Sequence, residues 1–472
     1  MVGYALEGDD EMETQNNLED WLAHSGEVLV VGLAKSGAAV AELLVRHGFR
    51  VTVNERQVRQ DGDLVVERLE RAGVRFVFGG HPESLLHTDW QFVVKNPGIP
   101  YDMPLIAGLV AQARPVFTEI EVASWFARSP IYAITGSNGK TTTTTLVGEM
   151  LTADGQRPAV AGNIGTVVSG VVETLEPSQP IALEVSSFQL MGTWRFHPRI
   201  AALLNFFPAH LDYHGSFEAY QSAKWKMFDN MTADDVAVLN RDHDLVRPGA
   251  AKLDATVHWF STRETDFENG AGVTDGHIVM VAGGRPRSLM RVDELALKGG
   301  HNLQNFLAAA TIAAAAGASD EAIRTIGLTF QGVEHRLEFV REVAGVRYYN
   351  DSKATNPAAC RQGLSAFPHN VVWIAGGLDR GIMFDDLVPD IKGRVKAAVL
   401  LGETQGKLKS ACDAAGIPSV TLVDSLEAAV EQAHRVASVG DVVLLSPACA
   451  SWDMFTSFEV RGSMFKEAVH RL

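Results

Sequence analysis

The chain of 472 residues is poor in cysteine, with only Cys360, Cys412 and Cys449, far apart in the sequence. Three scattered cysteines are too few for a disulfide framework or a zinc site, so we expect small buried side chains in a reducing compartment. The chain also lacks an apolar run near the ~20 residues that cross a bilayer. We therefore expect a cytoplasmic protein with no membrane partner.

Excess positive charge is absent as well. The 41 Lys and Arg against 57 Asp and Glu give a formal net charge of −16. Nucleic-acid binding needs clustered Lys and Arg against the phosphates, so we expect no nucleic-acid partner. The polar, acidic start, EGDDEMETQNNLED, is the opposite of a secretory signal. Residues 1–24 are expected to form a flexible, solvated extension.

The length predicts about three domains at ~150 residues each. Short β-branched runs alternate with longer helical patterns in three blocks, which is typical of α/β folds with parallel sheets. We predict a Rossmann-like domain at 25–126, a central phosphate-loop domain with a mixed sheet at 127–332, and a second Rossmann-like domain at 333–472. The turn Gln331-Gly332-Val333 is a plausible hinge.

The segment ITGSNGKTT at 134–142 is the most informative. It reads as the end of an apolar strand, a glycine turn and a Thr-rich helix start, which places backbone N–H groups and a positive helix end against an anion. Lys140 would add a charge to the outer phosphates, and the Thr141 hydroxyl could reach Mg²⁺. Only two residues separate Gly136 from Gly139, unlike the common GxxxxGK[ST] spacing. The segment indicates ATP handling, with a glycine turn before an ordinary helix as the alternative.

Polar residues near later strands could complete a metal–nucleotide site. Glu184 ends an apolar strand, where a Mg²⁺ ligand is expected, although a solvated edge carboxylate is the alternative. A lone histidine such as His210 is more often structural, and a helix lysine such as Lys224 is usually solvated. Asn305 opens an alanine-rich helix and could bind a base, unless the segment only caps that helix through Asn302.

Two loops of the third block also follow apolar strands. They are NDSKATN at 350–356 and SPACASWDMF at 446–455. Substrates of open α/β sheets bind at the carboxyl ends of the strands, which is where both loops are expected. Each loop taken alone is equally compatible with a helix-capping turn.

Together these segments resemble the ATP-dependent Mur ligases of peptidoglycan synthesis. The shared segments occur in the expected order after residue 25: GSNGKTT at 136–142, GNIG at 162–165, EVSSFQL at 184–190, HLD at 210–212, HNLQN at 301–305 and HR at 335–336. NDSKATN and SPACASWDMF are most specific to the D-glutamate-adding member. The resemblance implies an ATP-dependent, monomeric ligase that joins D-glutamate to UDP-N-acetylmuramoyl-L-alanine through an acyl phosphate.

The resemblance also implies roles for the nucleotide and metal residues. The ATP phosphates would be held by Gly136, Ser137, Asn138, Gly139, Lys140, Thr141 and Thr142, and Asn305, Arg336 and Asp351 would bind the adenine, phosphate and ribose of ATP. Thr141 and Glu184 would hold one Mg²⁺, and His210 and Lys224 a second. Because an ammonium cannot ligate a metal, Lys224 would act as a carbamate formed with CO₂. Lys140, His210 and Lys224 are the implied catalytic residues.

The remaining implied roles concern the two other substrates. The UDP-substrate would contact Lys35, Ser36, Asn54, Arg56, Asn96, Gly98 and, near the reacting end, Asn163. D-Glutamate would contact Lys353, Thr355, Arg380, Ser451 and Phe458. Three positions depart from the pattern of the family that the chain resembles. Ala209 stands where relatives often carry an acidic residue, Asn54 where they often carry Asp, and Arg380 where they usually carry Lys. The forked guanidinium of Arg380 could still bind the side-chain carboxylate of D-glutamate.

Other functions fit the sequence less well. Another Mur-type amide ligase with a different amino acid is the main alternative, and NDSKATN with SPACAS argues against it. Folylpolyglutamate synthases lack a leading Rossmann-like nucleotide domain. An oxidoreductase function for the first block is not favoured because GLAKSG lacks the three-glycine spacing of GxGxxG. A nonenzymatic nucleotide-binding regulator is the remaining alternative.

Overall fold

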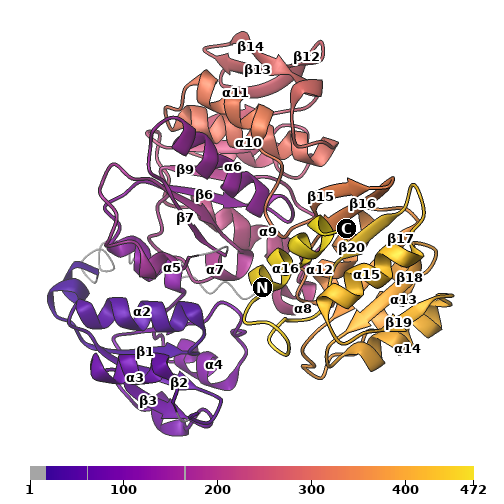
Figure 1. Ribbon diagram of the computed structural model, residues 1–472. Coiled ribbons are helices and arrows are strands. Elements are labelled where there is room, and N and C mark those ends of the chain that lie inside the picture. Colours follow the sequence, from indigo (N-terminus) through magenta and orange to yellow (C-terminus); the bar gives the residue numbers. More distant parts are fainter. Residues whose placement is uncertain (1–17, 61, 164–165) are drawn as a thin grey trace. The chain divides into compact units, whose positions relative to one another are not determined.

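The computed structural model describes residues 18–60, 62–163 and 166–472. The chain divides into two compact units between Phe330 and Gln331, at the turn predicted as a hinge. The first unit contains two sheets and the second contains one (Figure 1). The predicted domain boundary near residue 126 lies inside the first unit, between the two sheets.

The first sheet is fully parallel, with the strand order β3-β2-β1-β4-β5 that a Rossmann-like layout requires. Its strands are β1 (Glu27–Val31), β2 (Arg50–Glu55), β3 (Arg75–Phe78), β4 (Phe92–Lys95) and β5 (Val116–Phe117). Its helices are α2 (Lys35–Arg46), α3 (Leu64–Arg71), α4 (Pro104–Ala111) and α5 (Glu119–Trp125). Helices α2, α3 and α5 pack on one face and α4 on the other, so apolar layers bury both faces.

Residues 18–23 form a helical turn before β1. The Trp21 ring packs against Phe92, Phe117, Trp125 and Trp194, with centroid distances of 5.5 to 6.3 Å. Aromatic clusters of this kind stabilise a core beyond the area they bury. The predicted solvated extension therefore does not reach residue 24. Its first 17 residues lie outside the described residues.

The central sheet has nine strands in the order β14-β13-β12-β11-β10-β9-β6-β8-β7. Its strands are β6 (Ile131–Thr135), β7 (Ala159–Gly162), β8 (Ile181–Glu184), β9 (Ile200–Leu203), β10 (Val236–Asn240), β11 (Thr256–Phe260), β12 (Gly270–Thr274), β13 (His277–Ala282) and β14 (Arg285–Arg291). Strands β12 to β14 pair antiparallel and the rest pair parallel, which confirms the predicted mixed sheet.

Helices cover both faces of the central sheet. They are α6 (Lys140–Ala153), α7 (Ser187–Leu190), α8 (Leu211–His214), α9 (Phe217–Trp225), α10 (Gly300–Ala315) and α11 (Asp320–Thr329). Helices α6, α10 and α11 share one apolar core, and α7 and α9 contribute to the core on the opposite face (Figure 1). Burying a Leu, Ile or Phe side chain contributes ~1.5–3 kcal/mol, so these two layers fix the sheet on which the phosphate loop stands.

Helix α5 is fastened to the central layer by a buried carboxylate. Glu121 is 0% exposed and accepts backbone N–H groups from Trp194, Arg195 and Phe196 at 2.8, 2.9 and 2.9 Å. Its carboxylate also accepts the Trp125 indole N–H at 2.7 Å. Desolvation raises the pKa of Glu121 even though these bonds lower it. The two sheets of the first unit are joined through this group.

The second unit has one six-stranded sheet in the order β15-β16-β20-β17-β18-β19, parallel except for the β15–β16 pair. Its strands are β15 (Glu338–Val343), β16 (Val346–Asn350), β17 (Val371–Gly376), β18 (Val395–Leu401), β19 (Val420–Leu422) and β20 (Val442–Leu445). Its helices are α12 (Pro357–Ser365), α13 (Val388–Ile391), α14 (Gln405–Ala415), α15 (Leu426–Val436) and α16 (Phe458–His470). Helices α12 to α14 cover one face, and α15 and α16 cover the other.

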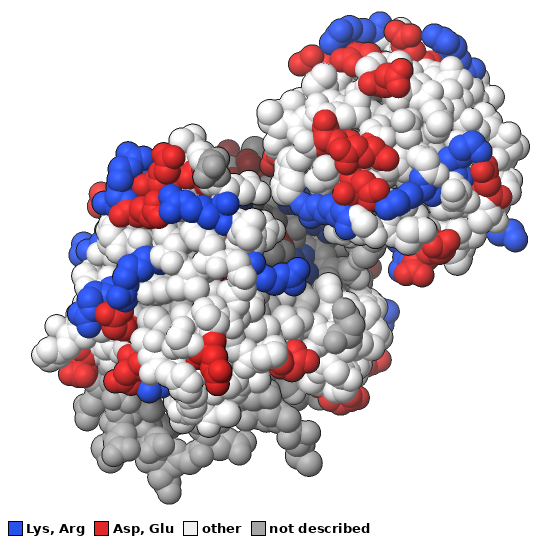
Figure 2. Space-filling view, turned by 90° about the horizontal axis from the view of Figure 1, so that it is seen from below, with Lys and Arg blue, Asp and Glu red and all other residues white. Residues whose placement is uncertain are grey.

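The cysteines and the surface charges behave as the composition predicts. Cys360, Cys412 and Cys449 are all buried and unpaired in disulfides. Burial raises the pKa of the Cys412 thiol to about 12 and of Cys449 to about 11. Figure 2 shows Asp and Glu side chains interspersed with Lys and Arg side chains. Within the described ranges, no helix is long and apolar enough to span a membrane.

Candidate nucleotide and substrate sites

The phosphate loop connects β6 to α6, as the sequence predicts. Gly139 has φ of 85° and precedes α6, which begins at Lys140. This left-handed conformation favours glycine. A Cβ on Gly139 would lie 2.2 Å from Oδ1 of Asn305, so Asn305 packs against the loop. The Lys140 ammonium donates to the carbonyl oxygens of Gly136 and Ser137 at 2.9 and 3.1 Å. Loop, helix start and lysine together form a phosphate cradle.

Thr141, in the first turn of α6, meets Glu184, the last residue of β8. The Thr141 hydroxyl donates to Oε2 of Glu184 at 2.7 Å, and the exposed fractions of the two residues are 5% and 2%. The other carboxylate oxygen accepts from the amide of Asn163 at 3.0 Å. Strands β6 and β8 pair in parallel, so their carboxyl ends lie at one edge. Buried oxygen ligands beside a phosphate cradle suit Mg²⁺, which prefers oxygen ligands.

Asn205 and Tyr220 support the loop and were not singled out from the sequence. Oδ1 of Asn205 accepts the Asn138 backbone N–H at 2.9 Å. The Tyr220 hydroxyl lies 2.8 Å from the Ser137 hydroxyl. Asn205 follows β9, the other neighbour of β6, so the strand-end rule could have found it. Tyr220 lies within α9, where an aromatic side chain reads as core.

Lys224 is buried rather than solvated. It is 1% exposed, and its ammonium donates to the Gly136 carbonyl oxygen at 3.0 Å and the Thr135 hydroxyl at 3.2 Å. Burial, followed by the charge of Lys140, lowers the pKa of Lys224 well below its ordinary value. His210 is exposed, has φ of 55° and precedes α8. The His210 ring lies 6.5 Å from the Tyr220 ring, and the Lys224 ammonium lies 4.8 Å from the same ring.

The start of α10 tests whether Asn302 caps this helix, the alternative to a nucleotide contact by Asn305. Asn305 is 7% exposed and lies on the phosphate-loop side of α10. The helix begins after Gly299, and no side chain caps it. Asn302 donates instead to the Lys298 carbonyl oxygen at 2.8 Å. The capping alternative for Asn302 is therefore wrong, and Asn305 stays a predicted ATP contact.

The residues predicted for the UDP-substrate follow or end β1, β2 and β4, except Asn163, which follows β7 of the central sheet. The Asn96 amide donates to the Ser36 hydroxyl at 3.1 Å, and its oxygen accepts the Gly98 N–H at 3.2 Å. Lys35 and Arg56 are exposed at the same edge. Asn54 differs because it is 0% exposed and donates to the carbonyl oxygens of residues 77 and 80. That geometry favours an internal role for Asn54 in holding the turn after β3.

The His335-Arg336 turn of the second unit contains Arg336, a predicted ATP contact. Asp351 is 5% exposed and accepts the Ser446 hydroxyl at 2.8 Å and the Leu337 N–H at 3.2 Å. Burial raises the pKa of Asp351 to about 7, and the charge of Arg336 acts in the opposite direction. The predicted pair Arg336 and Asp351 is therefore brought together within this unit.

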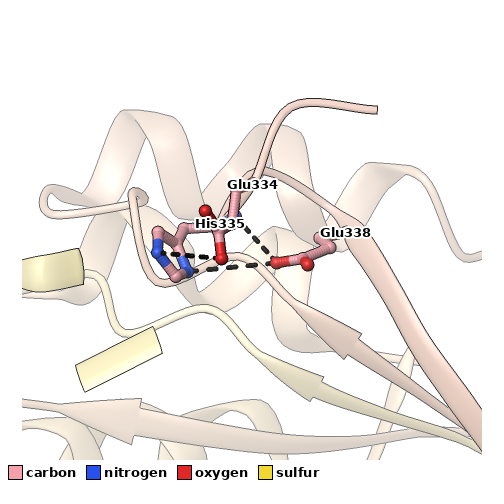
Figure 3. Close-up of side chains that lie close together, drawn as sticks. All are labelled: Glu334, His335 and Glu338. Atoms are coloured by element: carbon pink, nitrogen blue, oxygen red, sulfur yellow. Dashed lines mark hydrogen bonds and ion pairs between the residues drawn. The ribbon is translucent and has the colours of Figure 1, made fainter. Parts of the chain in front are cut away.

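A carboxylate–imidazole cluster braces that turn. The ligand-type atoms of Glu334, His335 and Glu338 lie within 4.8 Å of one another (Figure 3). The Lys466 ammonium donates to both carboxylates at 2.7 Å and so takes the place that a cation would need. The backbone N–H of His335 donates to the Glu338 carboxylate at 2.9 Å. We interpret the cluster as structural.

A buried guanidinium joins the two loops predicted for D-glutamate. Arg461 is 1% exposed and donates to the Ser352 carbonyl oxygen at 2.9 Å and hydroxyl at 3.0 Å. It also donates to the Cys449 carbonyl oxygen at 3.2 Å. NDSKATN and SPACASWDMF therefore lie side by side. The sequence analysis missed Arg461 because a helix arginine reads as solvated.

The predicted D-glutamate contacts form two groups in the second unit. The Lys353 ammonium lies 6.0 Å from the ring of Phe458. The exposed Arg380 guanidinium lies 4.7 Å from the Trp452 ring, next to buried Ser451. Thr355 is half-buried in the first loop. These contacts stay predictions, as do those proposed for ATP, metal and the UDP-substrate. Residues 164–165 of the GNIG segment lie outside the described part of the chain.

Three family profiles match successive segments of the chain. Profiles described as the Mur ligase MurD-like N-terminal domain, the Mur ligase middle domain and the Mur ligase glutamate ligase domain match residues 26–118, 134–313 and 335–449. A UDP-N-acetylmuramoylalanine–D-glutamate ligase of Geobacillus kaustophilus is 49% identical over 94% of this chain and 97% of its own. This chain belongs to the Mur ligase family.

Further Mur ligases extend the likeness. A UDP-N-acetylmuramoylalanine–D-glutamate ligase of Streptococcus pneumoniae is 46% identical over the same shares of both chains, 94% and 97%. Solved Mur ligases share the fold at lower identity. MurF from Acinetobacter baumannii has a TM-score of 0.54 at 17% identity and covers 93% of each chain. MurC from Thermotoga maritima has a TM-score of 0.52 at 18% identity and covers 94% of this chain and 99% of its own.

Proposed function

We propose that this Mur ligase joins D-glutamate to UDP-N-acetylmuramoyl-L-alanine with ATP, giving ADP and phosphate, in the cytoplasm as a monomer. The observation that carries the proposal is the 49% identity, over 94% of the chain, to a relative named for this activity. The described geometry supports it. The phosphate cradle stands beside buried oxygen ligands in one unit, and the NDSKATN and SPACASWDMF loops lie side by side in the other.

The first chemical step would be phosphoryl transfer. A carboxylate oxygen of the substrate attacks the γ-phosphorus of ATP, and the bond from phosphorus to the ADP oxygen breaks. Lys140 and the loop N–H groups hold the phosphates in line for this attack. The amine of D-glutamate then attacks the acyl carbon, loses a proton, and expels phosphate. The amide bond and inorganic phosphate are the balanced products.

Magnesium would bind at Thr141 and Glu184, whose buried oxygens already lie 2.7 Å apart. It would neutralise charge on the phosphates. The second proposed site needs His210 and a carbamate on Lys224. An amine reacts with CO₂ only as the free base, and the lowered pKa of Lys224 favours that form. A protonated amine has no lone pair for a metal, whereas the carbamate would supply an oxygen ligand.

Phosphate release measured with purified protein tests the reaction. Release should need ATP, Mg²⁺, UDP-N-acetylmuramoyl-L-alanine and D-glutamate together, and it should fall to background when any one is omitted. Equal rates with L-alanine, L-lysine or diaminopimelate would refute the proposed amino-acid specificity. The exposed variant Glu149→Ala on α6 serves as a preparation control.

Carbamylation has a separate test. Lys224→Ala should lose nearly all activity and regain part of it with short carboxylic acids, which can supply the missing oxygen ligand. A carbamate should also give a ¹³C signal after incubation with ¹³C-bicarbonate that is absent in the variant. Wild-type activity in Lys224→Ala would reject the carbamate.

A further inference from the structure

Among the residues that the structure describes, no carboxylate forms an ion pair with the buried amine of Lys95. This residue ends β4 and is 0% exposed, and its ammonium donates to the Ile99 carbonyl oxygen at 2.8 Å and, more weakly, to that of Pro97 at 3.4 Å. It also donates to the Tyr213 hydroxyl at 3.2 Å and lies 4.4 Å from the Tyr101 ring. Burying an ammonium among neutral oxygens costs stability. A side chain kept in such a place is a candidate for a functional role.

Tyr213 reaches the same two carbonyl groups from the central layer. Its hydroxyl lies 3.1 and 3.0 Å from the carbonyl oxygens of Pro97 and Ile99, so its single proton is shared between them. These two residues belong to the turn 96–99, which also contains Asn96 and Gly98, two predicted UDP-substrate contacts. Lys95 and Tyr213 therefore hold this turn through two of its carbonyl groups.

Tyr213 also connects this turn to the predicted metal ligand His210. Both residues lie at α8, which begins directly after His210. The Phe188 ring packs edge-on against both side chains, at 4.5 Å from Tyr213 and 4.8 Å from His210. A continuous set of contacts thus runs from the UDP turn through Lys95, Tyr213 and Phe188 to His210, all within the first unit.

We propose that Lys95 and Tyr213 are positioning residues that fix the UDP-binding turn relative to His210. They would orient the bound nucleotide sugar so that its carboxylate reaches the phosphate loop. The inference rests on the proposed function, since it assigns the turn 96–99 to the UDP-substrate. Neither residue touches the reacting atoms in this scheme.

Direct binding and steady-state kinetics test the assignment. In Lys95→Met, the Kd for UDP-N-acetylmuramoyl-L-alanine, measured by calorimetry, and its KM should each rise about tenfold. The KM values for ATP and D-glutamate should stay within about twofold. The melting temperature should not fall, because methionine fills a similar volume without a buried charge. Tyr213→Phe should give the same pattern, and the double variant should be no worse than the worse single variant.

Lys226→Met is the matched control. Lys226 is a half-buried lysine, and it donates to the carbonyl oxygens of Met191 at 3.4 Å and Thr193 at 2.9 Å rather than to those of the turn. It should leave the Kd for the nucleotide sugar within twofold. An unchanged Kd in both Lys95→Met and Tyr213→Phe, or an equal rise in all three KM values, would overturn the positioning role. Failure of the wild type to bind the nucleotide sugar would instead refute the proposed function.

Discussion

Oδ1 of Asn305 occupies the place that a side chain on Gly139 would need, 2.2 Å from the position of its Cβ. The glycine also has φ of 85°, a conformation that other residues adopt at a cost. Helix α10 and the phosphate loop are therefore fitted to each other at this point. Space and backbone conformation can be separated experimentally, because the chain offers a second glycine with nearly the same φ.

Gly139→Ala should abolish tight ATP binding, raising the KM for ATP about 100-fold or more, because the loop and Asn305 must move apart. Gly155→Ala is the control, since Gly155 has φ of 82° and open space around its Cβ. Both variants should lose about 1 kcal/mol of stability through backbone strain. Only the first should lose ATP binding, measured by nucleotide titration. Equal KM values in the two variants would contradict the fitted contact.

Glu121→Ala should destabilise the first unit by about 3 kcal/mol or more. The change leaves buried N–H groups of residues 194–196 without an acceptor, and each such group costs ~1–3 kcal/mol. Chemical denaturation followed by tryptophan fluorescence measures the loss. Exposed Glu149→Ala should stay within about 0.5 kcal/mol of wild type. A similar small loss in Glu121→Ala would show that the carboxylate does not fasten α5.

The buried carboxyl of Asp351 should make stability fall as pH rises. Its pKa is raised to about 7 in the folded chain, against ~3.9 when unfolded. Between those values the folded state binds more protons than the unfolded state, so the free energy of unfolding decreases from about pH 4 to about pH 7 and then levels. Asp351→Asn removes this titration. It should be more stable than wild type at pH 8 and should bind ATP less well.

Denaturation curves at pH 5 and pH 8 test the sign. The gap between wild type and Asp351→Asn should be larger at pH 8. Asp234→Asn, at an exposed position, should leave the pH dependence unchanged. If Asp351→Asn were less stable than wild type at pH 8, the bonds from Ser446 and Leu337 would outweigh the desolvation of the carboxylate.

Arg380→Ala should raise the KM for D-glutamate about tenfold and leave the KM for ATP unchanged. The Trp452 ring, 4.7 Å from the guanidinium, holds it in place, so Trp452→Ala should raise the same KM by a smaller factor. Arg361→Ala removes another arginine of the same unit, paired with Asp390, and serves as the control. An unchanged KM for D-glutamate in Arg380→Ala would remove this residue from the site.

The sequence predicts the strand-end residues well. Thr141 and Glu184 could be placed together because parallel strands bring their carboxyl ends to one edge. The same rule placed Asn96 and Asp351 in loops at such edges. This rule needs only the positions of strands and turns, and short sequence patterns predict those positions.

Contacts between distant segments could not be predicted in this way. Lys95 is not singled out from the sequence, and Lys224 taken alone is expected to be solvated, because nothing nearby in the sequence covers either side chain. Tyr213, 118 positions after Lys95, makes the first lysine a buried one. Arg461 reaches Ser352 across 109 positions. Asn54 is an example in the opposite direction. It was predicted to contact a ligand, but its side-chain amide donates to carbonyl oxygens inside the protein.

The buried thiols give the native chain a practical property. All three are enclosed, and burial raises their pKa, so few thiolates form near neutral pH and maleimide dyes should react slowly with the wild type. Cysteines introduced at exposed positions, one in each unit, can then be labelled without first removing the native ones. Fluorescence energy transfer between such dyes would report, in real time, any change in separation of the two units during turnover.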